Sequence, residues 1–403
     1  MKSEAASCVP QHVPRDLVVD FDVYDPPGSR QNFHAAWATL LDDAVPPLVW
    51  TTANGGHWMP TKGAILARIW ADSENFSNRL SVVPKDVGMQ FFGIPQSLDA
   101  PLHGNFRMLL TGLLGPKAIN RMQDQVRALA CELINAIEPQ GQCDFSADYA
   151  NVLPVRIFMT MVDLPLADAD YLVEINEHII RPHGGMSVVE ANAKLNEYLR
   201  EPVNRRLGGD REDLLSRMIN GRVDGGRTLT PDEAVNMAKL VLQGGLDTVS
   251  NLLSFAMNHL ASDPSLQVKL AQQPDLVASA VEEMIRRFPV ICTGRLVKRD
   301  MIYEGVQLHA GDPLVMPNAV HGLDPRENPE PLKVDLDRRE RAHTAFGQGA
   351  HRCPGAYLAR MEARITITEW LRRIPQFAVD SDRVRYRGGV VAAVEVLPLS
   401  WKI

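Results

Sequence analysis

The chain has 403 residues, of which 45% are hydrophobic and 23% charged, and its formal net charge is −7. This composition supplies ample material for a core and excludes a chain that is disordered throughout. The negative charge and the lack of a basic run argue against nucleic-acid binding. Because no linker rich in Pro, Gly and Ser divides the sequence, we expect residues 1–403 to form one domain.

The N-terminal segment, residues 1–25, mixes charged residues with prolines and has no apolar stretch. We therefore expect neither a signal peptide nor a membrane anchor, and no membrane partner. The five cysteines are scattered without metal-finger spacing, which is typical of a reducing compartment and predicts a cytoplasmic protein. Four of them are expected to be small buried apolar side chains: Cys8, Cys131, Cys143 and Cys292.

Short strand signals lie near both ends of the chain. They are residues 46–52 ("PPLVWTT"), 56–61 ("GHWMPT"), 305–317 ("GVQLHAGDPLVMP") and 388–401 ("GGVVAAVEVLPLSW"). Elsewhere apolar residues recur at helical spacing, as in residues 120–137. The sequence therefore predicts a mainly α fold with a minor β portion, concentrated in the N-terminal third and near the C-terminus.

One predicted helix is unusually long. Thr230, Pro231 and Glu233 form a capping-box start, and Asp263 with Pro264 forms a stop. About 32 residues lie between them, which makes roughly 48 Å of helix at 1.5 Å per residue. The apolar sequence of this helix predicts that it is buried and crosses the whole molecule.

Gly244, Gly245, Asp247 and Thr248 interrupt the apolar sequence of this helix. Each glycine costs about 1 kcal/mol relative to alanine in a helix interior. The hydroxyl of Thr248 can bond the carbonyl of Gly244 and bend the helix. Taken alone, these residues also fit a close helix crossing, so their meaning depends on a second motif.

That second motif is "HTAFGQGAHRCPGAYLAR", residues 343–360, which places Cys353 between a glycine-rich loop and a predicted helix start. A helix N-terminus favours the thiolate over the thiol, so Cys353 is a candidate ligand or nucleophile. Its neighbours suit a large, flat, anionic group, because they offer close backbone approach, an aromatic face and hydrogen-bond donors. They are Gly347, Gly349, Gly355, Phe346, His351 and Arg352.

Three chemistries are open to Cys353. A nucleophile needs a base, and the sequence singles none out. A zinc site needs three or four ligands, of which only one can be named. A lone thiolate beside anion-binding residues instead suits the axial ligand of haem iron, since a porphyrin supplies the other four nitrogens.

Residues 346–355, "FGQGAHRCPG", resemble the haem-binding signature of the cytochrome P450 family. "GGLDT" (244–248) resembles the family's oxygen-binding groove. "EEMIRR" (282–287) contains its Glu-x-x-Arg pair, Glu283 and Arg286, which takes a downstream partner such as Arg338 or Arg339. The chain is identified as a relative of the bacterial camphor hydroxylase subfamily over essentially its whole length. The resemblance implies a triangular prism with a long central helix over haem b.

The resemblance also implies how haem b is held. Cys353 is the axial ligand of the iron, and the loop residues Phe346, Gly347 and Gly355 border the porphyrin. Close relatives have an aspartate where this chain has Thr293, so one propionate contact is expected to differ. The residues expected to hold the two propionates are His103, Arg107, Arg295 and His351.

The activity implied is that of a monooxygenase, which inserts one atom of O2 into a C–H bond and reduces the other to water. Gly244, Asp247 and Thr248 are the expected catalytic residues. In this interpretation Thr248 donates a hydrogen bond on the oxygen side and Asp247 relays protons from solvent.

Electrons must come from another protein, because no Gly-x-Gly-x-x-Gly fingerprint follows a strand and no flavin domain is appended. The subfamily implies a [2Fe–2S] ferredoxin and an NADH-dependent ferredoxin reductase. Arg107, Arg352 and Arg360 are expected to form a local basic patch for this acidic partner.

A hydrophobic terpenoid or norisoprenoid is the predicted substrate. Phe91 stands where the camphor enzyme has a tyrosine that bonds the ketone, so we expect poor camphor binding. Arg79 replaces a carboxylate that holds a monovalent cation, so we expect no such ion. Gln243 faces either the substrate or a neighbouring helix. The expected pocket residues are Phe91, Val82, Gly93, Leu240, Gln243, Ile180, Ile291 and Val391.

Two other functions remain as alternatives: a haem-thiolate peroxygenase and a non-catalytic haem sensor or carrier. Asp247 and Thr248 argue against a carrier, which has no use for a proton relay. Product formation with ferredoxin and NADH, compared with peroxide alone, distinguishes the first from the expected monooxygenase.

Overall fold

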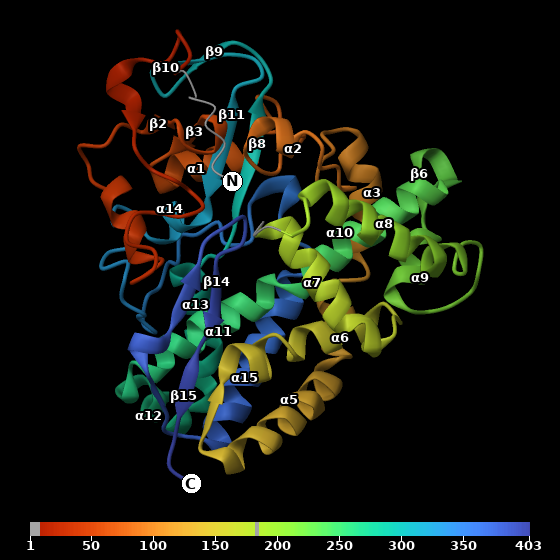
Figure 1. Cartoon of the computed structure of the whole chain (residues 1–403), viewed down its shortest axis with the longest axis vertical. Helices are drawn as coiled ribbons and strands as arrows, with labels where there is room; N and C mark the ends of the chain where they lie inside the picture. The colour runs from red at the N-terminus through yellow and green to blue at the C-terminus, as the bar shows by residue number, and fades with distance from the viewer. Residues whose placement is uncertain (1–8, 182–184) are drawn as a thin grey trace.

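A computed structural model describes residues 9–181 and 185–403. Its helical part dominates the lower two thirds of Figure 1. None of the helices in the described ranges is long and apolar enough to span a membrane. The principal helices are α1 (Gly63–Ala71), α3 (Leu102–Thr111), α5 (Gln123–Ile137), α6 (Leu153–Met161), α7 (Ala169–Ile180), α8 (Val188–Asn204), α9 (Leu214–Ile219), α10 (Pro231–Leu246), α11 (Thr248–Ala261), α12 (Pro264–Gln272), α13 (Val277–Arg287) and α15 (Ala356–Arg373).

A six-stranded mixed sheet lies at the other end of the molecule, toward the top of Figure 1. Strand β11 runs parallel to β3 and antiparallel to β8, with Leu314 opposite Trp58 on one side and Arg295 on the other. The strands, in sheet order, are β1 (Val18–Val19), β2 (Leu48–Thr51), β3 (His57–Pro60), β11 (Pro313–Pro317), β8 (Cys292–Val297) and β4 (Phe76–Ser77).

The mainly α fold with a minor β portion is confirmed. All four predicted strand regions contain strands, the last two containing β10 (Val306–Leu308) with β11, and β14 (Ala393–Val396) with β15 (Pro398–Ser400). Strand β8 was not predicted, because its sequence "CTGRLV" carries a glycine and an arginine in place of an apolar run. Within this sheet β8 nevertheless lies between β11 and β4.

The prediction of one long central helix is wrong in one respect. The capping box of Thr230 and Glu233 starts α10 as expected, but the helix breaks at Asp247, where φ is −138° and ψ is −39°. Beside the break, the hydroxyl of Thr248 donates to the carbonyl of Gly244 at 3.1 Å. This side-chain bond takes up a helix carbonyl and competes with the regular backbone ladder. α11 then continues from Thr248.

Two hydrophobic clusters form the core. The larger is built from the helices, with Phe158 and Leu253 among its buried members. The smaller joins the sheet to α1 through residues such as Trp58 and Leu66. Of the cysteines, Cys292 is buried as expected, whereas Cys131 and Cys143 are only partly so, and Cys8 lies outside the described residues.

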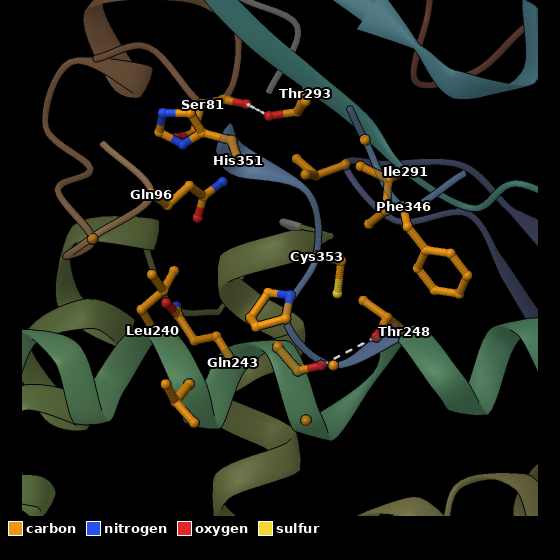
Figure 2. A pocket seen from close by; sticks show the side chains of 18 of the residues that line it. Ser81, Gln96, Leu240, Gln243, Thr248, Ile291, Thr293, Phe346, His351 and Cys353 are labelled. Carbon is orange, nitrogen blue, oxygen red and sulfur yellow. Dashed lines mark hydrogen bonds between the residues drawn. The ribbon is translucent and has the colours of Figure 1, made fainter. Parts of the chain in front are cut away.

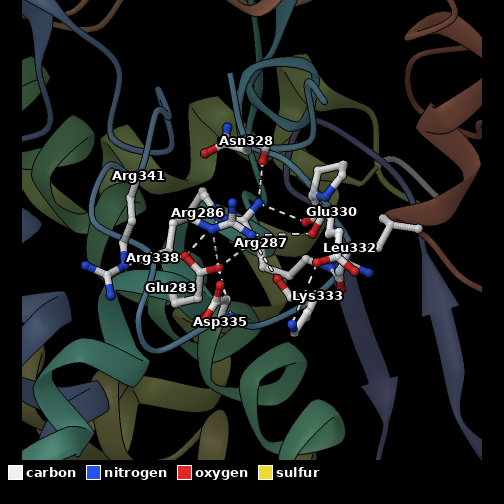
Figure 3. A network of polar contacts seen from close by, with 12 residues as sticks. Glu283, Arg286, Arg287, Asn328, Glu330, Leu332, Lys333, Asp335, Arg338 and Arg341 are labelled. Carbon is white, nitrogen blue, oxygen red and sulfur yellow. Dashed lines mark hydrogen bonds and ion pairs between the residues drawn. The ribbon is translucent and has the colours of Figure 1, made fainter. Parts of the chain in front are cut away.

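The Glu-x-x-Arg pair sits in a buried polar network (Figure 3). The guanidinium of Arg286 donates to both carboxylate oxygens of Glu283, at 2.8 and 2.9 Å, and both side chains are fully buried. Of the two expected downstream partners, Arg338 donates to Glu283 at 2.8 Å. Arg286 also bonds the carbonyl oxygens of Gly322 and Lys333, which ties α13 to the segment that precedes the Cys353 loop.

The neighbouring glycines of α10 give opposite predictions. A Cβ at Gly245 would lie 2.4 Å from the ring of Phe158, whereas a Cβ at Gly244 would meet no atom within 4 Å. We expect Gly245→Ala to destabilise the protein by about 1–3 kcal/mol through overpacking against a buried ring. Gly244→Ala, the matched control, should leave stability unchanged or raise it by up to about 1 kcal/mol. Thermal unfolding of both variants checks this, and equal melting temperatures would contradict the packing described.

Candidate haem and oxygen site

A cavity of about 420 Å³ lies between the helical cluster and the sheet. Its walls come from segments far apart in the sequence, including α1, α10, the loop after α2 (Lys85–Gly88) and the Cys353 loop. Phe158 and Leu252 contribute from the helical side and Trp70 from the sheet side. The elements that the sequence separates by hundreds of residues therefore share one interior space.

Cys353 is exposed to this cavity, where Figure 2 shows its sulfur between the loop and the α10–α11 region. Its backbone N–H donates to the carbonyl of Phe346 at 2.8 Å, which closes the loop. Gly347 has a φ of +67°, and a Cβ there would lie 3.0 Å from the indole of Trp70. The loop conformation thus requires glycine at this position.

The backbone N–H groups at the helix N-terminus favour the Cys353 thiolate as expected, but they act against the effect of burial. Cys353 precedes the N-cap of α15, Gly355, by two residues. Burial raises the pKa of the thiol, while the backbone N–H groups of Gly355 and Ala356 and the charge of Arg107 oppose that rise. In the protein alone the burial effect prevails, so a positive ligand such as iron is needed to hold the thiolate.

One end of the cavity carries four cationic or imidazole side chains. The rings of His103 and His351 lie with centroids 3.8 Å apart. The guanidinium of Arg295 stacks 4.5 Å above Trp70 and donates to the carbonyl of Gly294. Arg107 donates to the carbonyl of Arg352. All four expected propionate residues therefore line the same cavity.

None of these four side chains has an ion pair with the described residues, and Asp99 acts on three of them only at longer range. Arg295 is only 4% exposed and has no ion pair among the described residues, and burial lowers its pKa to about 9. Burial, together with the neighbouring His103 and Arg295, lowers the pKa of His351 to about 3. An unpaired buried cation is costly, so the site is built for a ligand that brings negative charge. Haem fits, since its iron suits a single sulfur and its propionates suit this end.

Thr293, which stands where close relatives have an aspartate, makes a hydrogen bond within the protein. The hydroxyl of Thr293 donates to the carbonyl of Ser81 at 3.2 Å, as the dashed line in Figure 2 shows. It lines the cavity without carrying a charge. In the described part of the chain no group of three or more His, Cys, Asp or Glu side chains could hold a metal ion, which leaves iron coordination to Cys353 and the porphyrin.

Of the expected catalytic residues, Gly244 and Thr248 line the cavity and Asp247 does not. Asp247 lies behind the helix break in a buried ion pair with Arg181, whose NH1 is 3.1 Å from Oδ2. Asn251 also donates to Asp247, at 2.9 Å. Burial raises the pKa of Asp247, and Arg181 opposes the rise. The carboxyl of Asp247 thus lies between the α10–α11 break and Arg181. Arg181 also pairs with Glu177, which is partly exposed.

Seven of the eight expected substrate residues line the cavity; Val391 does not, although its neighbour Val390 does. Figure 2 shows Gln96, Leu240 and Gln243 on one side of Cys353 and Ile291 on the other. The side chain of Gln243 has no hydrogen bond to the described residues, which favours a role toward the substrate. Arg79 donates to the carbonyl oxygens of Met89 and Phe91 at 2.7 and 2.8 Å. Its guanidinium thus binds the loop carbonyl oxygens that could otherwise face a cation.

The sequence analysis missed two charged residues of the cavity wall, Lys239 on α10 and Glu362 on α15. Both carboxyl oxygens of Glu362 are buried without a hydrogen-bond partner, and burial raises its pKa to about 8. Helical periodicity could have found them, since each falls among the buried positions of its helix, where a charged residue is unusual.

Comparison with known proteins adds an independent finding. The family model described as "Cytochrome P450" matches residues 185–383. A protein of Sinorhizobium fredii named "Probable cytochrome P450 127A1" is 31% identical over 98% of this chain and 97% of its own. Among solved structures, CYP101J2 is 42% identical with a TM-score of 0.90, covering 98% of this chain and 99% of its own. CYP101C1 is 39% identical with a TM-score of 0.89, covering 98% and 100%.

Glu362 generates a pH-dependent prediction. In the unfolded chain a glutamate ionises near pH 4, whereas the folded chain holds this proton up to about pH 8. The stabilisation is therefore fully present below the unfolded pKa and is lost as pH rises through the folded pKa. We expect Glu362→Gln, which keeps the shape without ionising, to gain melting temperature over the wild type as pH rises from about 5 to about 8.5.

Thermal unfolding of the holoprotein across this range measures the effect. Glu340→Gln, at an exposed carboxylate, is the matched control and should follow the wild type. If the Glu362→Gln and wild-type curves stay parallel with pH, the protonated buried carboxyl is refuted.

Proposed function

The chain belongs to the cytochrome P450 family of haem-thiolate monooxygenases, and on that premise we propose that it hydroxylates a small hydrophobic substrate, a terpenoid or norisoprenoid, with electrons from a [2Fe–2S] ferredoxin. One observation carries the proposal: the Cys353 thiol and the Gly244–Thr248 turn face the same apolar cavity. The cavity thus contains a sulfur ligand from Cys353, a hydroxyl from Thr248 and space for an apolar molecule.

Haem b, when bound, supplies the activation of dioxygen, which a thiolate axial ligand favours. Cys353 is the residue that would hold its iron. His103, Arg107, Arg295 and His351 would neutralise its propionates, since they line one end of the cavity and form no ion pair with the described residues. Phe346, Gly347 and Gly355 border the same space. The apolar walls exclude water, which strengthens each of these charge contacts.

The residues at the α10–α11 break supply the protons. The Thr248 hydroxyl donates to the Gly244 carbonyl at 3.1 Å, so it must rotate away from this carbonyl to donate a hydrogen bond into the cavity. Asp247, buried beside it in the chain, can accept a proton when its bond to Arg181 loosens and pass it toward the cavity. The nonhelical backbone at Asp247 sets its carboxyl apart from the regular helix, next in the chain to Thr248, which lines the cavity.

The substrate class follows from the cavity walls. Phe91, Leu240 and Ile291 offer apolar surface without a hydroxyl donor. Since a ketone would lack the bond that a tyrosine provides, shape and apolar contact dominate recognition, and camphor should bind poorly. Arg79 holds the Met89–Phe91 backbone that carries this wall, so its guanidinium positions the pocket loop.

The expected docking patch for ferredoxin becomes smaller in the structure. Arg360 bonds both oxygens of Glu282, at 2.6 and 2.9 Å, and lies over Phe346, so its charge is matched internally. Arg107 turns into the cavity. Arg352 is exposed next to Cys353 and has no ion pair with the described residues. We propose Arg352, with exposed Arg364 on α15, as the contact for the acidic partner.

The proposal extends to the cellular location of the protein and to its domain organisation. The free cysteines of the described ranges suit a reducing compartment, so we propose that the protein acts in the cytoplasm. Because the cavity is lined from both hydrophobic clusters, we propose that one domain spans the chain. The peroxygenase and the haem sensor or carrier are separated from the proposal by experiment.

Reconstitution with a [2Fe–2S] ferredoxin, its reductase, NADH and β-ionone tests the proposed reaction and the role of Thr248 together. Hydroxylated product should form in the wild type. Thr248→Ala should keep consuming NADH but yield several-fold less product per NADH, because the hydroxyl is lost. Thr248→Ser, which retains a hydroxyl, should recover most of the coupling.

Other outcomes discriminate among the alternatives. Product with hydrogen peroxide alone, and none with the ferredoxin system, would establish a peroxygenase. Substrate binding without product in either system would establish a sensor or carrier. Coupling in Thr248→Ala at the wild-type level would remove Thr248 from the proton path.

Arg352→Glu tests the docking patch. Reversal of this exposed charge should raise the KM for ferredoxin several-fold, with a loss that shrinks as salt screens the contact. The matched control is Arg15→Glu, at an exposed arginine before β1 that does not line the cavity. Steady-state NADH oxidation against ferredoxin concentration provides the measurement. An unchanged KM with intact haem incorporation would place the partner elsewhere.

A further inference from the structure

Lys239 is an anomaly in the cavity wall. It lies on α10, is 7% exposed, and lines the cavity. Burial lowers the pKa of its ammonium group, and no charged side chain of either sign adds to that shift. Within the described ranges Lys239 makes neither a hydrogen bond nor an ion pair.

Most other deeply buried cations in the described residues have an anion. Arg287, 6% exposed, has none, but its Nε donates to the carbonyl of Leu332 and its guanidinium lies over the ring of Phe288. Arg181, 3% exposed, pairs with Asp247, and Arg286, fully buried, pairs with Glu283. Arg295 faces the end of the cavity that suits the haem propionates. Lys239 has no such counterpart among the described residues, because Glu362, the acid of the cavity wall, forms no ion pair with it and its own carboxyl oxygens are unpartnered. A buried ammonium without an anion is costly, so its counterpart must arrive with a ligand.

The position of Lys239 along α10 separates it from the reaction centre. It precedes Thr248 by nine residues, or roughly 13 Å along a helix at 1.5 Å per residue. Figure 2 shows the next residue, Leu240, on the far side of the view from Thr248. The side chain thus meets the end of a bound molecule that is remote from Thr248.

A second donor lies one turn away. Gln243 follows Lys239 at i+4, which places both on one face of α10, and both line the cavity. The amide of Gln243 has no hydrogen bond to the described residues, so its N–H groups are available to the same ligand. An ammonium and an amide on one helix face form a site for a carboxylate, away from the His103, Arg107, Arg295 and His351 end of the cavity.

We propose that the substrate carries a carboxylate at the end remote from the oxidised carbon, and that Lys239 pairs with it while Gln243 donates a hydrogen bond. This inference rests on the proposed function and narrows its substrate class from apolar terpenoids to apolar carboxylic acids of that size. The apolar walls hold the hydrocarbon skeleton, and Lys239 fixes which carbon reaches the Thr248 side. Lys239 is a specificity-determining residue, outside the proton path of Asp247 and Thr248.

Spectral titration of the ferric holoenzyme tests the proposal. The probes are 4-isopropylcyclohexanecarboxylate and its primary amide, which share one skeleton and differ in charge. The wild type should bind the acid at least about tenfold more tightly than the amide, as loss of a charged hydrogen bond predicts. Lys239→Met, which keeps the length of the side chain without the charge, should abolish this preference, and Lys239→Arg should restore it.

Isothermal titration calorimetry gives a second readout that does not depend on the spin state of iron. Lys269→Met, at an exposed lysine of α12, is the matched control and should behave as the wild type. Equal binding of acid and amide, no binding of the acid, or an unchanged preference in Lys239→Met would each overturn the proposal. Because these are binding measurements, they stand apart from the product assay that decides whether the protein is a monooxygenase.

Discussion

The structure depends on a set of charged and polar groups that converge, without partners of their own, on one apolar cavity. Cys353 is exposed there, Arg295 is buried there without an ion pair, and the rings of His103 and His351 lie against each other. In a dry interior such groups are costly unless a ligand completes them. The cavity therefore needs a ligand to be stable. A flat dianionic molecule with a central metal would satisfy Cys353 and the cationic end of the cavity.

The rest of the fold holds this cavity open. The glycine at 347 lets the Cys353 loop pass within contact distance of Trp70 on α1. The buried Glu283–Arg286–Arg338 network fixes the chain that leads into that loop. On the opposite wall, Gly245 packs directly on Phe158, which brings α10 close to α6 and leaves Gly244 facing open space. These contacts fix the backbone around the cavity, so they determine the shape of the cavity. The reactive side chains themselves take no part in them.

Motifs with a local cause were readable from the sequence. The capping box at Thr230 predicted the start of α10, and the motif around Cys353 predicted residues that line one cavity, because both depend on residues adjacent in the chain. The bond from Thr248 to the Gly244 carbonyl was predicted as a cause of bending, but a full break at Asp247 was not, because periodicity cannot weigh a side-chain bond against the helix ladder. Asp247 was expected to relay protons from solvent, but its pairing with Arg181 was not predicted, because it depends on a helix far away in the sequence. Lys239 and Glu362 were missed because a charged residue in a helix is normally on its solvated face.

The ligation of iron by Cys353 is the claim on which every other assignment depends, and the carbon monoxide difference spectrum of the reduced holoprotein tests it most directly. We predict that the wild type shows a Soret band displaced far to the red, as thiolate ligation produces, and that Cys353→Ser loses this band. A wild-type spectrum without the displaced band, or a Cys353→Ser spectrum that retains it, would contradict the account.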